Sequence, residues 1–344
     1  MPTRLLLTLI LVLCWNALGA QERGSALYRG EATVAGADET ARAQALREAL
    51  MRVLIKLTGR PDAMQQPGMV EALAQAPRLA ARVGYRQQFE GEAVRDVLIA
   101  DFDPDGVNVL LAKSGLVIWP EPRPTPVLWL AIDDGRGPRL VTSSQGAAVA
   151  SLREAGAARG LRFLLPEGAA EEENFGLQAA WRDDPEAAEA LRSRYPGAVQ
   201  LLGRLYRSEG GWRGEWTLRE HDEALRHWSD AGPDARALMA GAADTAADVL
   251  AGRFSELMAA GPPGVFTVRI EGINSADDYP RVMAYLGSLG PVRRATPILA
   301  DDRGLTLELD LAVGLEGFRR LVGAGPVLGE AGDAGDMPLF RVRR

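Results

Sequence analysis

Cysteine and histidine are almost absent from this chain. Its 344 residues include one cysteine, Cys14, and two histidines, His221 and His227. One cysteine cannot form a disulfide within the chain. One cysteine and two histidines together cannot supply the four Cys and His ligands of a common structural zinc site. We expect both histidines to be structural or solvated, because they lie near a polar hairpin turn. Stability must come from burying apolar side chains, which make up 47% of the sequence.

Phosphate-binding loops and nucleophile elbows are also missing. No G-x-G-x-x-G follows a predicted strand, no G-x-x-x-x-G-K-[ST] occurs, and no G-x-S-x-G is present to expose a catalytic serine. A basic face is lacking as well, because the formal net charge is −7. This balance argues against non-specific nucleic-acid binding and against electrostatic attachment to anionic lipid. The sequence therefore predicts no cofactor and declares no reaction.

Residues 1–20, MPTRLLLTLILVLCWNALGA, have the pattern of a secretory signal peptide. Arg4 supplies the positive start, Leu5 to Trp15 form an apolar stretch too short to span a bilayer comfortably, and small residues follow. Cleavage is expected after Gly19 or after Ala20. Cleavage after Gly19 fits the preference for small residues at the first and third positions before the cut better, because Ala17 then stands where cleavage after Ala20 would place Leu18. We therefore predict export to the periplasm.

Two other interpretations of this segment stay open. One is an uncleaved N-terminal anchor, and the other is lipid attachment at Cys14, although Leu13 stands where a small residue is required. Beyond this segment, no stretch approaches eighteen consecutive apolar residues. No transmembrane helix is therefore expected after signal cleavage.

Hydrophobic periodicity and turn residues divide the rest of the chain into three small modules of α+β and α/β type. The first, residues 26–119, is predicted to follow the order β-α-β-β-α-β. Its strands are expected at 27–34, on both sides of Gly91 and at 116–119, and its helices at 37–57 and from Pro104 onwards. Asp38 and Asp103 are the predicted N-caps, and Gly59 ends the first helix.

A proline-rich connector leads to the second module, residues 126–260, which is predicted to be a central α/β sheet with a hairpin and a long helix. Strands are expected at 127–133, 161–166 and 198–207, and helices at 146–160, 185–197 and 235–258. The third module, residues 265–344, has the order β-α-β-β-α with a candidate closing strand. That order predicts a ferredoxin-like split β-α-β unit.

The stretch ALREALMRVLIKLTGR, residues 45–60, has the most regular helical pattern in the chain. Leu46, Leu50, Val53 and Leu57 recur at spacings of 4, 3 and 4, which is typical of a helix that covers a sheet. A membrane-surface helix would need a wider apolar face and a richer basic face. We therefore predict that this helix forms one wall of a core.

Candidate ligand-binding residues lie at the strand ends of the central module. Asp133 and Asp134 close the strand 127–133, at the edge where α/β sheets often bind ligands, and Arg204 lies on another predicted strand. Two adjacent carboxylates could hold a cation or a polar ligand there, and a solvated loop is the alternative. No catalytic and no metal-binding residue is predicted.

Two further acidic patterns favour ordinary structural roles. DFDPDG, residues 101–106, matches the opening of a calcium loop, but Ala112 stands where the bidentate glutamate is required. A strand end followed by an Asp-capped helix is therefore favoured. EEEN, residues 171–174, is predicted to be an exposed loop.

Several stretches together resemble a known family. They are ARAQALREALMRVLIKLTGR, VLWLAIDDG, RYPGAVQLLGRLYR and GWRGEWTL. In an exported chain, they resemble the proteobacterial proteins grouped as domain of unknown function 2066, over most of the mature chain. LIKLTGR (54–60) and LGRLYR (202–207) are the most specific pieces. The resemblance implies an exported envelope protein, and it supplies no established activity and no catalytic residues.

These observations predict a periplasmic binding or scaffold protein, or an envelope-assembly accessory, that is non-catalytic and has a protein partner in the envelope. Small modules joined by stiff linkers commonly offer sheet edges and grooves to partners. The alternative is a small-ligand enzyme, a hydrolase, with its site at the strand ends of the central module. A deep pocket with convergent polar groups would favour that alternative.

Overall fold

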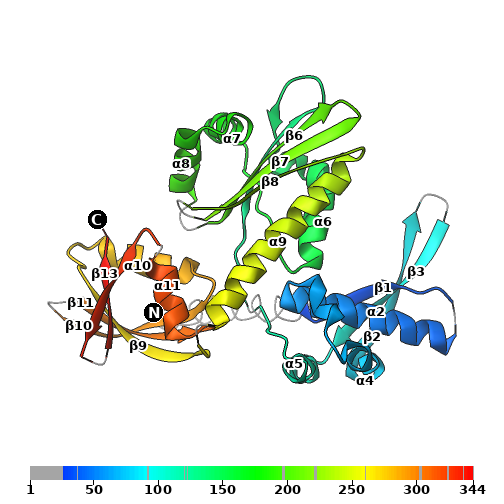
Figure 1. Ribbon diagram of the computed structural model, residues 1–344, viewed down its shortest axis with the longest axis horizontal. Coiled ribbons are helices and arrows are strands. Elements are labelled where there is room, and N and C mark those ends of the chain that lie inside the picture. The colour runs from blue at the N-terminus through cyan, green and yellow to red at the C-terminus, as the bar shows by residue number, and fades with distance from the viewer. Residues whose placement is uncertain are drawn as a thin grey trace, which may run out of the picture. The chain divides into compact units, whose positions relative to one another are not determined.

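The computed structural model describes residues 26–343 apart from 37, 91–92, 120, 122, 196–197, 221–222, 260, 302–303, 324 and 336. The predicted signal peptide, with Cys14, and His221 lie outside the described residues. The chain divides into two compact units, one of residues up to 118 with 158–160 and one of the remaining residues. The described residues form three sheets with many helices (Figure 1). This mixed content confirms the predicted multi-module α+β class.

The first unit is built on a three-stranded antiparallel sheet with the strand order β1-β3-β2. Its strands are β1 (Arg29–Thr33), β2 (Ala80–Glu90) and β3 (Ala93–Phe102). Its helices are α2 (Glu39–Thr58), the 3-10 helix η1 (Pro61–Gln65), α3 (Met69–Leu73), α4 (Ala76–Leu79) and α5 (Pro104–Lys113). The predicted order β-α-β-β-α is therefore present, with short helices added between α2 and β2.

Residues 116–119, all of them described, form no strand, and the prediction of a closing strand there is wrong. Leu116 and Ile118 pack against the apolar core of the first unit, whereas Trp119 is buried in the core of the second. The apolar pattern of this segment thus reflects burial of its side chains. It does not reflect pairing of its backbone with a strand.

Helix α2 begins and ends where capping chemistry predicts. The Asp38 carboxylate accepts a hydrogen bond from the Ala41 N–H at 2.7 Å. At the other end, Gly59 has a left-handed φ of 69° and its N–H donates to the Ile55 carbonyl at 2.8 Å. The prediction of a core wall is confirmed, because the apolar stripe of the helix is buried at Leu46, Leu50, Val53, Leu54 and Leu57.

Replacing Leu50 with aspartate tests this placement. Leu50 is fully buried, so Leu50→Asp removes apolar packing and places a carboxylate without a partner in the core. We expect the free energy of unfolding to fall by at least about 4 kcal/mol, measured by thermal and urea unfolding. Gln44→Asp, at an exposed position of the same helix, is the matched control. A Leu50→Asp protein that melts like the control would refute the core placement.

The second unit contains two five-stranded sheets. The first of them has the strand order β5-β4-β6-β7-β8, in which β4 and β6 are parallel and the other neighbours antiparallel. Its strands are β4 (Val127–Asp133), β5 (Arg139–Leu140), β6 (Gln200–Ser208), β7 (Gly211–Glu220) and β8 (Glu223–Gly232). The accompanying helices are η2 (Ser143–Val149), α6 (Ala150–Ala158), α7 (Ala170–Arg182), α8 (Pro185–Arg194) and α9 (Ala235–Ala259). This is the mixed, helix-covered sheet that the sequence predicts.

The strand predicted at 161–166 is absent from these described residues and is replaced by a single bridge between Leu164 and Val127. The Leu128 N–H donates to the Leu164 carbonyl at 2.8 Å, and the Leu164 N–H donates to the Pro126 carbonyl at 2.9 Å. Leu161 is fully buried. Phe163 is buried as well, whereas Leu164 is 45% exposed, and the segment pairs only with the start of β4.

The two faces of the central sheet are packed differently. Helices α7 and α8 cover one face of β4 and β6, in a cluster that includes Trp129 and Leu202. The opposite face carries Leu128, Leu205 and Trp216. On that face the Trp216 ring lies over Gly203 of the neighbouring strand, where an added Cβ would come within 2.3 Å of the ring. Only glycine therefore fits at 203 beside this tryptophan.

The second sheet of this unit has the strand order β10-β11-β9-β13-β12, with β9 and β13 parallel. Its elements are β9 (Gly264–Glu271), α10 (Asp278–Ser288), β10 (Val292–Asp301), β11 (Gly304–Leu311), α11 (Leu315–Gly323), β12 (Leu328–Ala334) and β13 (Met337–Val342). Strands β9 and β10, joined by α10, are parallel with β11 between them, and this is the split β-α-β arrangement predicted for the third module. The candidate closing strand is present as β13, but it runs parallel to β9. In a ferredoxin-like unit the closing strand is antiparallel to the first, so the full ferredoxin-like topology is not formed. One cluster of buried side chains runs from β4 through α9 to β11 and β13. The residue boundaries predicted for the three modules stay a prediction.

None of the described helices combines the length and the apolar composition needed to cross a bilayer.

Candidate functional site

Asp133 and Asp134 lie at the end of β4, as the sequence predicts, and both carboxylates are engaged by the loop that follows. The Asp133 carboxylate accepts hydrogen bonds from the Gly135 N–H at 2.8 Å and the Gly137 N–H at 3.0 Å. The Asp134 carboxylate accepts from the Arg139 guanidinium at 3.0 Å. The two acids thus hold the turn between β4 and β5.

Arg204 lies on β6, and its guanidinium points toward β7 and α7. It donates to the Glu215 carboxylate, with a distance of 2.9 Å from Nε, and to the Trp181 carbonyl at 2.9 Å. Tyr206 also donates to Glu215, at 2.7 Å, and this bond raises the pKa of the Tyr206 hydroxyl above its ordinary value. The bonds of Arg204 therefore run away from Asp133 and Asp134. The ligand-binding role of these three residues stays a prediction.

The residues predicted as an exposed loop at 171–174 lie in helix α7, so that prediction is wrong. Glu172 is only 2% exposed, because α7 packs against α8 and the sheet. Its carboxylate accepts from Arg194 Nε at 2.6 Å, the Tyr195 hydroxyl at 2.8 Å and the Gly168 N–H at 3.2 Å. Burial by itself would raise the pKa of Glu172, but these three donors outweigh it and the pKa lies below its usual range.

Glu172→Gln tests whether this buried carboxylate ties α7 to α8. At neutral pH we expect the substitution to lower the free energy of unfolding by about 1.5–3 kcal/mol, the usual range for hydrogen bonds to a charged group. Because the folded-state pKa is depressed, the contribution is present above the unfolded pKa of about 4.3 and is lost as the pH falls through the folded value. Urea unfolding at neutral and at acid pH measures both effects.

Glu171→Gln is the matched control, because the neighbouring Glu171 side chain is 72% exposed. It should change stability little at either pH. A Glu172→Gln protein that is as stable as the control at neutral pH, or one whose deficit grows in acid, contradicts this account.

Two of the three aspartates of DFDPDG have structural partners, as the sequence favours. Asp101 forms an ion pair with Arg29 at 2.6 Å, and Asp103 caps α5 by accepting from the Gly106 N–H at 3.0 Å. Among the described residues, no group of three or more His, Cys, Asp or Glu side chains is placed to hold a metal ion.

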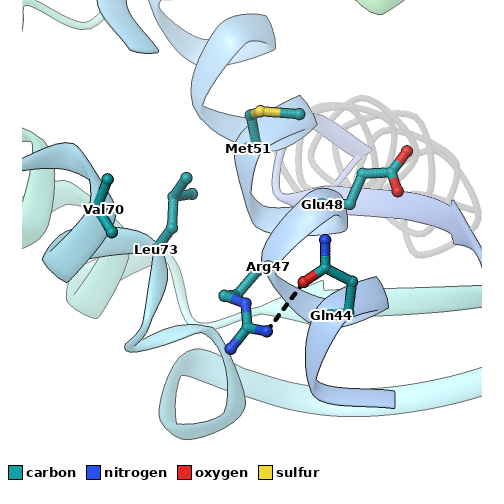
Figure 2. Close-up of a pocket in the computed structure, with 6 residues that line it drawn as sticks. All are labelled: Gln44, Arg47, Glu48, Met51, Val70 and Leu73. Carbon is teal, nitrogen blue, oxygen red and sulfur yellow. Dashed lines mark hydrogen bonds between the residues drawn. The ribbon is translucent and has the colours of Figure 1, made fainter. Parts of the chain in front are cut away.

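A pocket in the first unit lies between the outer flank of α2 and the short helix α3 (Figure 2). Its cavity volume is about 310 Å³, and six residues line it: Gln44, Arg47, Glu48, Met51, Val70 and Leu73. Met51, Val70 and Leu73 supply the apolar part of the lining. Val70 is 80% exposed, so an aliphatic side chain stands at the rim in contact with water.

The polar side chains of this pocket already bond to each other or to the same helix. Arg47 donates to the Gln44 amide oxygen at 2.9 Å, which is the dashed line in Figure 2. The Glu48 carboxylate accepts from Arg52 at 2.5 Å. The pocket therefore offers apolar surface with a polar rim of both charge signs. Its polar groups do not point toward one common position, as those of a catalytic site do. Sequence reasoning missed it, because the five residues of α3 are too few for a periodic pattern.

One family model matches the first unit of the chain. The model of a family described as "Domain of unknown function (DUF8605)" matches residues 22–120. No curated protein matches the chain significantly. Among solved structures, a formyltetrahydrofolate deformylase from Pseudomonas putida KT2440 aligns over 54% of this chain and 88% of its own, at 9% identity and a TM-score of 0.15. A similarity of that size carries no argument.

The family match corrects the resemblance to domain of unknown function 2066, which is wrong. Both pieces that suggested it have structural roles. LIKLTGR holds buried leucines and the glycine that ends α2, and LGRLYR lies within β6, where Leu202 and Leu205 are buried. The matched residues 22–120 are similar to that other domain family, and they include the sheet of the first unit, helices α2 to α5 and the α2–α3 pocket.

Proposed function

We propose that the protein is a non-catalytic binding or scaffold protein whose first unit docks an apolar side chain of a protein partner in the α2–α3 pocket. The observation that carries this proposal is the apolar lining of Met51, Val70 and Leu73, which stands open to water beside a polar rim. Exposed apolar surface rimmed by polar residues marks interaction sites in soluble proteins.

The size and lining of the pocket favour a side chain or one helical turn as its occupant. Its volume of about 310 Å³ lies at the lower end of the range for small-molecule sites, about 300–1,000 Å³. Methionine adapts its shape to different apolar groups, so Met51 suits a partner whose side chain must be accommodated on binding. Arg47 and Glu48 then provide charges of both signs for the edge of the contact.

A small-ligand hydrolase with its site at the strand ends of the central sheet is the alternative proposal. It would use Asp133, Asp134 and Arg204. The geometry supports it less well, because the two carboxylates hold the β4–β5 turn and Arg204 is bonded to Glu215 and Trp181.

Site-specific crosslinking tests the docking proposal. A photo-crosslinking amino acid at position 70 should form a discrete adduct with another protein in cells, identified by mass spectrometry. The same amino acid at position 109 is the control, because Val109 is also exposed, at 52%, but lies on α5 and does not line the pocket. Leu73→Asp should weaken partner binding at least about tenfold, which corresponds to about 1.4 kcal/mol.

An adduct that forms equally at positions 70 and 109, or that survives Leu73→Asp, would contradict docking in this pocket. Val70→Asp, measured by partner binding and not by the position-70 crosslink, is a second variant that should weaken binding while leaving folding intact. At 80% exposure its effect on the free energy of unfolding should stay within about 0.5 kcal/mol.

Export to the periplasm is part of the proposal, and it rests on the signal-like pattern of residues 1–20. Alkaline phosphatase fused after residue 120 should be active in a bacterial host, because that enzyme needs the oxidising periplasm to form its disulfides. Replacing Leu9 and Leu11 with arginine should abolish the activity by breaking the apolar stretch. An inactive fusion to the unchanged chain would contradict export.

A further inference from the structure

The β2–β3 hairpin of the first unit is longer than the elements that accompany it. Strand β1 pairs only with Val97–Asp101 of β3, whereas β2 pairs with β3 along the whole length of both strands. The outer part of the hairpin is thus a two-stranded ribbon, and Figure 1 shows it extending away from α2. Strand β2 has β3 on one side and forms one edge of the described sheet.

Apolar side chains lie on one face of the outer part of this ribbon, and together they are called the apolar strip, with the polar pair Gln87 and Asp96 between them on the same face. Tyr85 is 56% exposed, Phe89 is 71% exposed and Val94 is 53% exposed. Phe89 stands opposite Val94, and Tyr85 stands opposite Leu98, which is fully buried in the core of the unit. Residues opposite each other, and every second residue of a strand, share one face. The strip therefore continues the core face of the sheet beyond the part that is buried.

The edge of β2 has only some of the features that usually prevent strands from pairing with other chains, namely charged residues and one irregularity of the ladder. Its sequence, AARVGYRQQFE, contains no proline and no lysine. Its two arginines have partners within the unit, since Arg86 pairs with Glu31 at 2.6 Å and Arg82 lies 3.9 Å from Asp101. An irregularity of the ladder stands only at the start of the strand, between Ala80 and Arg82. From Arg82 onwards the edge is regular and open to pairing.

We propose that β2 pairs in antiparallel fashion with β2 of a second copy of this chain, with Gln87 opposite Gln87 of the other copy. A two-fold axis perpendicular to the sheet generates such a pair and brings together residues that share a face. The two sheets of three strands then become one sheet of six. This inference goes beyond the docking function proposed above, because it uses a different surface of the first unit.

The charges and aromatic side chains of β2 select this register. Axes through Gly84 or Arg86 place arginine opposite arginine, which is destabilising. An axis through Tyr85 leaves Phe89 opposite Ala81, at the irregularity of the ladder. An axis through Gln88 places Arg86 opposite Glu90, but it leaves Phe89 opposite Gln87 and forms no aromatic pair. The axis through Gln87 places Tyr85 opposite Phe89 twice and Arg86 opposite Gln88. Cross-strand aromatic pairs stabilise sheets, and this register covers the most exposed residue of the strip.

A second copy suits this edge better than an unrelated peptide does. In this register Tyr85 of each copy stands opposite Phe89 of the other, so the same two side chains supply both sides of the contact. An acidic peptide would find one arginine of β2, Arg86, already paired with Glu31 at 2.6 Å, and only Arg82, whose side chain is 83% exposed, largely in solvent.

Cysteine trapping tests the register in the full-length chain. Cys14 is the only natural cysteine, so a Cys14→Ser background carries no other thiol. Opposed residues of antiparallel strands have Cα atoms about 4.5–5.5 Å apart, within the range of a disulfide. Gln87→Cys should therefore give a disulfide-linked dimer on mild oxidation, whereas Tyr85→Cys and the control Val109→Cys should stay monomeric on a non-reducing gel.

Sedimentation equilibrium tests the association itself. The chain without introduced cysteines should be dimeric, and Phe89→Lys should weaken dimerisation at least about tenfold while leaving the melting temperature of the monomer unchanged, because Phe89 is exposed. A chain that is monomeric at all soluble concentrations, or one trapped through Tyr85→Cys and not through Gln87→Cys, overturns the proposal. Retention of the position-70 crosslink in Phe89→Lys, with loss of the dimer, would show that the two surfaces act separately.

Discussion

The shortness of β1 is the constraint from which the exposed face of the β2–β3 ribbon follows. Five residues of β1 face five residues of β3, and α2 packs on that pairing. The remaining part of β3 has only β2 as a neighbour, so the apolar face of the sheet continues past the end of its cover. A longer β1 would pair with the outer part of β3, but it would not reach β2, whose other edge would stay unpaired in the described sheet.

The parts of the fold that sequence reasoning predicts are those where side-chain chemistry acts locally. Helix α2 was predictable because Asp38 caps it, Gly59 ends it and bulky leucines repeat between them. Helix α7 was not, because it packs on the sheet with Gly176, Ala179 and Ala180, and such small residues produce no apolar stripe. Strand β12 was missed for a related reason: LGEAGDA, mostly exposed, reads as a loop until its pairing with β13 is known.

For the candidate site, the sequence locates residues but not their bonds. The position of Asp133 and Asp134 at the end of β4 was predictable from the buried run before them. Their engagement by Gly135, Gly137 and Arg139 depends on the turn that follows, which periodicity does not describe. The exposure of Phe89 was equally hidden, since alternating residues look the same in a strand whether or not a helix covers them.

The close approach of Trp216 to Gly203 has a consequence for how this chain tolerates change. The space that a side chain would occupy at 203 is filled by an indole from the next strand, so the volume of the two positions is shared. A residue larger than glycine at 203 is compatible with the packed sheet only if the ring at 216 becomes smaller. The effects of substitutions at 203 and 216 on the free energy of unfolding are therefore expected to be strongly non-additive. Which residues are accepted at one position depends on the residue at the other.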